Sequence, residues 1–224
     1  NKGQPIAETE EGVRNFWGWF GNSENVDAEL RPEVFYHSGD GNFTEMKESK
    51  RFGRAMFLTR HSPANYGSTT YPLYLKGDVL SNNNMRRMLY GDEGIEIIRK
   101  AIGKNINDND AEIIIDDLTN GGNYPTDEYV WGLINAFDEA SAQINIQTLR
   151  SKVAAMLGYD AVQTPDEFDG ETVMISNPEQ IKSATGNSGE FSPENPDIRY
   201  SKRRSKVDDG DAFYSALTRG VESL

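Results

Sequence analysis

A histidine, a tyrosine and a glutamate stand at comparable places in three separate segments of the chain. His37 ends one apolar run, Tyr66 follows a second, and Glu171 begins a third. Each segment is typical of a β-strand, and each carries or leads to one side chain that a strand does not need for packing. Three such side chains delivered from three strands suggest one assembled site, although no single segment is enough to predict it.

The neighbours of these residues strengthen the prediction. Gly39 and Gly41 follow His37 closely, and glycines allow a ligand to approach the backbone. Glu171 comes directly after a glycine and an acidic loop, where a carboxylate can hydrogen-bond a ligand hydroxyl or stabilise a cation. Taken singly, each residue also fits a simpler interpretation: a satisfied strand histidine, a core or surface tyrosine, and an ordinary strand-edge glutamate. The second histidine, His61, is expected to be solvated in a loop.

Several common classes of site do not fit the sequence. The chain has no cysteine, which excludes disulfides and thiolate metal sites. The acids at 166, 167 and 169 lack the spacing of an EF-hand, so no metal site is predicted. There is no Walker A loop, no GxGxxG after a strand, no GxSxG elbow and no HExxH. These absences disfavour P-loop hydrolase, Rossmann, esterase and zincin activities.

The composition limits the class of partner. The 224 residues carry a net charge of −13, which disfavours a nucleic-acid backbone as the main partner but not a small nucleotide. No apolar stretch approaches the roughly 20 residues of a membrane span, and no signal-peptide pattern is present, so no membrane partner is expected. Because the chain does not begin with methionine, we expect a fragment of a longer polypeptide.

The periodicity predicts an α+β domain in which a helical block separates two sets of strands. A flexible lead-in at 1–10 precedes a domain at 11–184, and an extended arm and linker follow at 185–224. Within the domain we expect a helix at 11–20, strands at 34–36, 52–59 and 71–75, a helix start at Ser62, a helical block at 84–157, and strands at 159–163, 171–176 and 180–184. The block contains four apolar stripes at helical spacing, the third formed by Val130, Trp131, Ile134 and Phe137.

Four segments match the motifs of a known family. They are YHSG at 36–39, the segment from Gly53 to Tyr66, ETVMI at 171–175 and NPEQIK at 177–182. Together they resemble the ADP-ribosyltransferase fold in its diphtheria-toxin and poly(ADP-ribose) polymerase branch, which carries a His–Tyr–Glu triad in this chain order. This resemblance implies a split β-sandwich of two small sheets, here with a helical insertion and an extended C-terminal arm.

The flanking segments indicate a more specific group of domains within this family. FWGWFG at 16–21, QIKSATGN at 180–187 and NPDIRYS at 195–201 are similar to ADP-ribosyltransferase-type domains of phage and prophage polyvalent proteins. The segment 213–219 resembles the linker that follows such domains. The match covers roughly 13–83 and 157–220, and the helical block between these segments lies outside the resemblance.

The resemblance implies NAD as a substrate and assigns roles around the nicotinamide. Glu171 would be the catalytic residue: it would bind the nicotinamide-ribose hydroxyl and stabilise the oxocarbenium-like transition state. Tyr66 would stack on the nicotinamide ring, and Tyr71 is a possible second stacking residue.

The first motif would hold the remaining parts of NAD. His37 would hydrogen-bond the adenosine ribose, and the backbone at Ser38 and Gly39 would recognise the nicotinamide carboxamide. Ser38 stands where the family usually has glycine, which a backbone contact tolerates. Asp169 lies two residues before Glu171, where arginine-modifying relatives of another branch carry a glutamate, and an acid there could orient a guanidinium.

The expected activity is mono-ADP-ribosyl transfer from NAD to a host macromolecule, most simply a bacterial protein, in the cytoplasm of a host reached by phage delivery. A nucleic-acid acceptor is not favoured but stays open, as does the oligomeric state. Two alternatives also stay open. One is NAD glycohydrolysis with water as the acceptor, and the other is a non-catalytic binding module, because a fold alone does not determine an activity.

Overall fold

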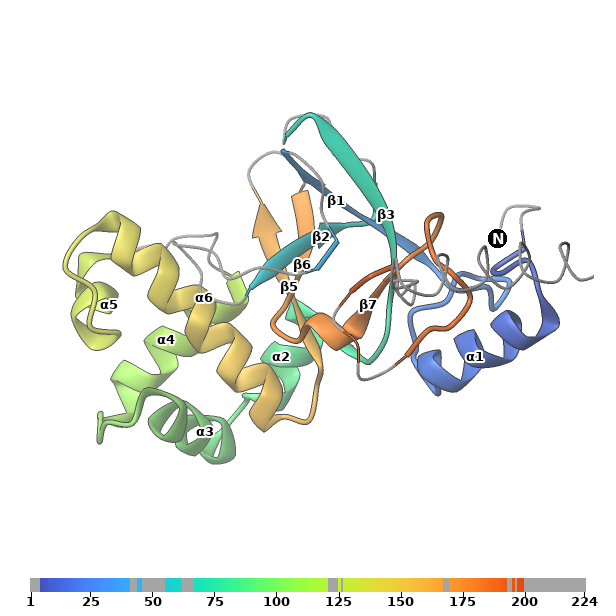
Figure 1. The fold of residues 1–224 in the computed structure, drawn as a ribbon. Coiled ribbons are helices and arrows are strands. Elements are labelled where there is room, and N and C mark those ends of the chain that lie inside the picture. Colours follow the sequence, from blue (N-terminus) through green and yellow to red (C-terminus); the bar gives the residue numbers. More distant parts are fainter. Residues whose placement is uncertain are drawn as a thin grey trace, which may run out of the picture.

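The α+β class predicted from the sequence is confirmed by the structure, a computed structural model (Figure 1). It describes residues 5–40, 44–45, 55–61, 67–120, 125, 127–166, 170–192, 195 and 197–199. The elements in chain order are α1 (Glu10–Phe20), β1 (Val34–Gly39), β2 (Met56–Thr59), β3 (Thr69–Leu75), β4 (Val79–Leu80), α2 (Asn82–Met88), α3 (Asp92–Ile102), α4 (Asp108–Asn120), α5 (Glu128–Leu133), α6 (Glu139–Met156), β5 (Ala161–Asp166), β6 (Gly170–Ile175), the 3-10 turn η1 (Pro178–Gln180) and β7 (Ile181–Ser183).

The strands form one curled sheet in the order β4-β5-β6-β2-β1-β3-β7. All neighbouring strands are antiparallel except β4 and β5, which are parallel. The short strand β2 lies between β1 and β6: Thr59 is opposite Tyr36 on one side and opposite Thr172 on the other. Segments that are far apart in the sequence therefore become neighbours at the middle of the sheet.

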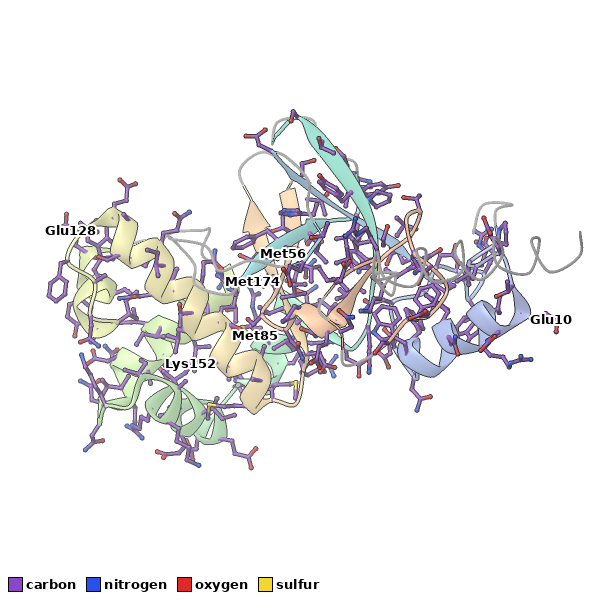
Figure 2. All side chains as sticks on the ribbon, in the orientation of Figure 1. Glu10, Met56, Met85, Glu128, Lys152 and Met174 are labelled. Atoms are coloured by element: carbon purple, nitrogen blue, oxygen red, sulfur yellow. The ribbon has the colours of Figure 1, made fainter. Side chains whose placement is uncertain are left out.

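Helices cover opposite ends of this sheet. In Figure 1 the block α2–α6 lies at one end and α1 at the other. The block packs against β5 and β6, and Figure 2 shows Met85 of α2 and Met174 of β6, both buried, where block and sheet meet. The other sheet face has its own core, which includes Phe35, Leu58 and Val173. None of the helices in the described part of the chain is long and apolar enough to cross a bilayer.

The helical block occupies the predicted region, but the third apolar stripe is wrong at its end. Val130 and Ile134 are buried as expected, whereas Phe137 is 92% exposed. The reason is local: α5 ends at Leu133, and Asn135 adopts a left-handed φ of 61°. The helical period is interrupted there, so Phe137 no longer lies on the buried face.

The described residues that follow β7 pack against the domain. Phe191 joins the aromatic cluster of α1, and Ile198 joins the core of the sheet; both side chains are 2% exposed. The backbone N–H of Ser183 in β7 donates to the carbonyl of Ile198 at 2.8 Å. Lys182 is buried, and its Nζ donates to the carbonyls of Asn195 at 2.5 Å and Asp197 at 3.2 Å. Apolar side chains and a buried ammonium thus hold the arm in place.

The aromatic cluster should anchor α1. Phe16 is fully buried, with ring centroids 4.9 Å from Tyr74 and 5.0 Å from Phe191. We expect Phe16→Ala to lower the free energy of unfolding by about 3–5 kcal/mol, because it leaves a cavity in a packed core. Trp17→Ala is the matched control, since Trp17 is 43% exposed, and should cost less than half as much. Urea unfolding of both variants measures this, and equal losses would contradict the packing role.

The buried ammonium of Lys182 predicts a pH dependence of stability. Burial lowers the pKa of Lys182 to about 8 from 10.5, with attraction to Asp197 and Glu179 opposing the shift. Between these values the unfolded chain holds a proton that the folded chain has lost, so stability rises with pH in this window. We expect the free energy of unfolding of wild type, relative to that of Lys182→Met, to increase from pH 8 to 10.5, as measured by urea unfolding. The exposed Lys152→Met should keep the wild-type slope, and an unchanged slope in Lys182→Met would refute the assignment.

Candidate functional site

The sheet register places His37 and Glu171 on one face. Side chains alternate along a strand, and Tyr36, Thr59 and Thr172 form one row across three strands. His37 and Glu171 each adjoin this row, so both point to the opposite face. The strand spacing and rise put their Cα atoms roughly 12 Å apart in a flat sheet, and less where the sheet curls.

Tyr71 belongs to the same face as well. It lies directly opposite His37 in the β1–β3 pair, and its half-buried ring packs at the border of the sheet core. The structure therefore brings together three of the residues predicted from the sequence. Tyr66 and Asp169 lie outside the described residues, and their predicted roles stay predictions.

His37 is held in one orientation and one tautomer. Its Nδ1 lies 3.0 Å from the carbonyl oxygen of Phe57, and because a carbonyl only accepts, Nδ1 is the donor. Burial lowers the pKa of His37, and the hydrogen bond to Phe57 opposes this shift. The ring is then neutral at pH 7 with a lone pair on Nε2, which lies beside Gly39: a Cβ at Gly39 would be 3.6 Å away. A neutral imidazole of this tautomer can accept a hydrogen bond from a ligand hydroxyl.

The end of β1 is closely approached by the chain that follows β2. Gly67 has φ +67°, and a Cβ there would lie 2.5 Å from the carbonyl carbon of Gly39. The N–H of Ser68 donates to Asp40 Oδ1 at 3.1 Å. Ser38 points to the other face, where its hydroxyl is 2.8 Å from that of Thr70, so its backbone rather than its side chain belongs to the site. Glycine at 67 is what allows this approach.

Glu171 has two polar neighbours that the sequence did not indicate. Its side chain is exposed at the start of β6, and Gln163 Nε2 of β5 donates to its Oε2. Arg60 directly follows β2, where continuation of the register places it beside Glu171. Burial lowers the pKa of Arg60, and attraction to Glu171 opposes that shift. The carboxylate is thus oriented by an amide and lies in the field of a cation.

Arg60 itself bridges towards β1. Its guanidinium forms an ion pair with Glu33, which precedes β1, and lies 5.0 Å from the ring centroid of Phe35. The sequence carries only weak signals for Arg60 and Gln163. Arg60 is a polar residue at the end of an expected strand, and Gln163 is a polar residue that alternates with apolar residues in another. His61, which follows Arg60, is exposed as predicted. No group of three or more acidic or histidine side chains suited to a metal ion occurs among the residues that the structure describes.

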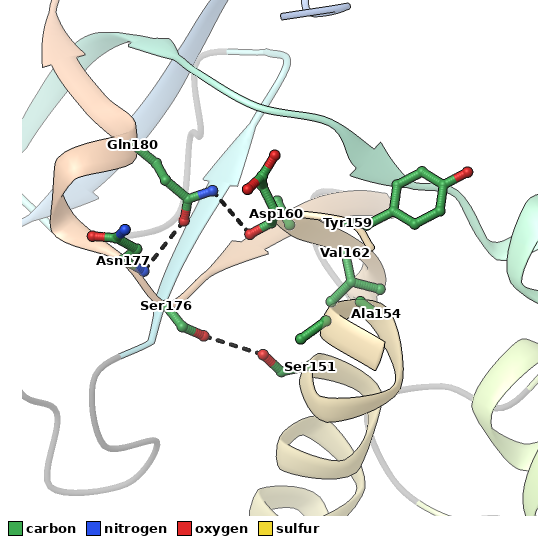
Figure 3. Close-up of a pocket in the computed structure, with 10 residues that line it drawn as sticks. Ser151, Ala154, Tyr159, Asp160, Val162, Ser176, Asn177 and Gln180 are labelled. Atoms are coloured by element: carbon green, nitrogen blue, oxygen red, sulfur yellow. Dashed lines mark hydrogen bonds between the residues drawn. The ribbon is translucent and has the colours of Figure 1, made fainter. Parts of the chain in front are cut away.

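A separate hollow lies at the other end of β6, shown in Figure 3. It has a volume of about 210 Å³ between the C-terminal part of α6 and the turn after β6. Ser151 and Ser176 face each other across it with hydroxyl oxygens 3.1 Å apart, and Gln180 Nε2 donates to the carbonyl of Asp160 at 2.9 Å. As far as the described residues show, its lining includes neither His37 nor Glu171.

Comparison with known proteins finds one distant structural similarity. No protein-family model matches the chain, and no curated protein matches it. Among solved structures the chain is similar to an anti-CRISPR protein, known from its crystal structure, with 18% identity and a TM-score of 0.46. The match covers 72% of this chain and 96% of that chain. A likeness at this level carries no argument about function.

The close approach at Gly67 can be tested directly. We expect Gly67→Ala to lower the free energy of unfolding by more than about 1 kcal/mol, because alanine is strained at positive φ and its Cβ meets the backbone of Gly39. Gly132→Ala in α5 is the control: a Cβ there meets nothing within 4 Å and should be neutral or stabilising. Urea unfolding measures both, and an unaffected Gly67→Ala would show that the approach is not required.

Proposed function

We propose that the chain is an NAD-dependent mono-ADP-ribosyltransferase. The observation that carries the proposal is the shared sheet face of His37, Tyr71 and Glu171, with Gly39 at the end of β1. This arrangement is what the resemblance in the motifs implies for an NAD site. The proposal includes the split-sandwich form of the fold, in which the curl of the sheet separates two smaller sheets with NAD between them.

The reaction requires the protein mainly to stabilise positive charge that develops as a bond breaks. The bond between C1′ of the nicotinamide ribose and the pyridinium nitrogen breaks, and its electron pair leaves with nicotinamide. Positive charge develops on C1′ and the ring oxygen, and the Glu171 carboxylate stabilises it while holding a ribose hydroxyl. The acceptor nucleophile then bonds to C1′ and loses its proton. Gln163 keeps the carboxylate oriented for this step.

The other residues bind NAD. The neutral ring of His37 accepts a hydrogen bond from an adenosine-ribose hydroxyl through Nε2, and the backbone at Ser38 and Gly39 reads the carboxamide. Tyr71 and Tyr66 are proposed as stacking residues. Arg60 partly offsets the negative charges of Glu33 and Glu171 in a chain of net charge −13, which lessens the repulsion of an anionic dinucleotide.

We further propose that the acceptor is a bacterial host protein, reached in the cytoplasm after phage delivery. The resemblance of the flanking segments to phage polyvalent proteins supports this choice, and the acidity of the chain disfavours nucleic acid. Incubation with labelled NAD in bacterial lysate, followed by identification of the labelled species, tests it. Rapid nicotinamide release without any acceptor would instead favour a glycohydrolase.

Glu171→Gln should abolish most of the activity. An amide keeps the shape but lacks the negative charge, so we expect transfer in lysate to fall about 100-fold or more, with NAD still bound. Glu112→Gln, on the exposed surface of α4, is the matched control and should behave as wild type. Nicotinamide release and label transfer measure both variants. Absence of NAD binding and of any transfer in wild type would reject the enzyme, leaving a non-catalytic module.

A further inference from the structure

One buried cation joins the helical block to the strand beside Glu171. Arg150 on α6 is fully buried. Its Nε and Nη2 both donate to the carbonyl of Leu118 at 3.2 Å, and its Nη1 donates to Gln147 Oε1 at 2.8 Å and to Thr164 Oγ1 at 3.1 Å. Arg150 therefore links α4, α6 and β5 through a single guanidinium.

The surroundings of Arg150 compensate the cost of burying its charge. Burial lowers the pKa of Arg150 to about 10, and attraction to the buried Asp117 opposes the shift, so the side chain stays protonated at neutral pH. Leu118 lies in the last turn of α4, where carbonyls lack intrahelical donors and the helix dipole is negative. An apolar side chain of similar size often stabilises a core as well as a buried charge does. A polar network at this point therefore suggests that it holds the linked segments in a defined position.

The network continues from Thr164 to both sides of Glu171. Thr164 Oγ1 donates to Gln147 Oε1 at 2.9 Å, and Thr164 is paired with Thr172 across the β5–β6 ladder. Thr172 Oγ1 donates to the carbonyl of Thr164 at 3.1 Å. Gln163, the residue before Thr164, points to the other face and donates to Glu171. Thr164 is therefore adjacent both to Gln163, whose amide donates to the carboxylate and also accepts from Asn82 N–H at 3.2 Å, and to Thr172, the residue after Glu171.

We propose that Arg150, together with Gln147, is a positioning residue that fixes the Glu171 carboxylate through Thr164 and Gln163. The helical block then serves as a rigid support for the β5–β6 hairpin. The kinetic consequence rests on the proposed function, whereas the structural coupling does not.

The kinetic test uses Thr164→Val, which removes the hydroxyl and keeps the shape. Because Glu171 acts in the transition state, a displaced carboxylate should lower kcat about tenfold and leave the KM for NAD nearly unchanged. Thr164→Ser restores the hydroxyl and should rescue kcat. Ile98→Val, fully buried in α3 and outside the network, is the stability control and should leave kcat unchanged. If Thr164→Val lowers the melting temperature but not kcat, as the control does, the coupling is overturned.

A second measurement does not depend on enzyme activity, and it tests the structural coupling separately from the proposed function. The side-chain amide resonances of Gln163, followed by NMR in the ligand-free protein, should shift in Thr164→Val and not in Ile98→Val. The amide of Gln180, which donates to Asp160, should stay unchanged in both. Unchanged Gln163 resonances in Thr164→Val would overturn the coupling, whatever the activity. A shift together with no NAD turnover in wild type would reject the proposed function and support the coupling.

Discussion

Strand β2 is only four residues long, yet its hydrogen bonds on both sides decide how the rest of the structure is arranged. It pairs with β1 through Tyr36 and with β6 through Thr172, two strands separated by more than 130 positions in the chain. Because side chains alternate, this double pairing also decides which residues share a face. A slip of one residue on either side would move His37 or Glu171 to the face that the helices cover.

The shared face has an uneven charge distribution. The chain is strongly acidic, but Arg60 lies next to Glu171 and pairs with Glu33, while burial keeps His37 neutral. The carboxylate therefore lies in a local field different from that of the chain as a whole. A carboxylate oriented in this way before a ligand arrives is what the proposed reaction would require.

The helical block and the C-terminal arm are built into the same framework. Arg150 ties two helices to β5, and Lys182 ties β7 to the carbonyls of the arm. Both are buried cations that satisfy backbone carbonyls, and both join segments that apolar packing alone would bring together less specifically. The hollow at the far end of β6 lies between the block and the sheet without reaching Glu171.

The sequence by itself determined the α+β class, most strands and the helical block, because periodicity and glycine placement are local signals. It also singled out His37 and Glu171, which the register places on one sheet face, while their roles stay predictions. It failed at Phe137, where a left-handed Asn135 interrupts the helical period. It also did not reveal Gln163 or Arg60, whose relation to Glu171 arises only from strand register. The tertiary structure alone decided those pairings, since register and burial depend on contacts between segments that are distant in the chain.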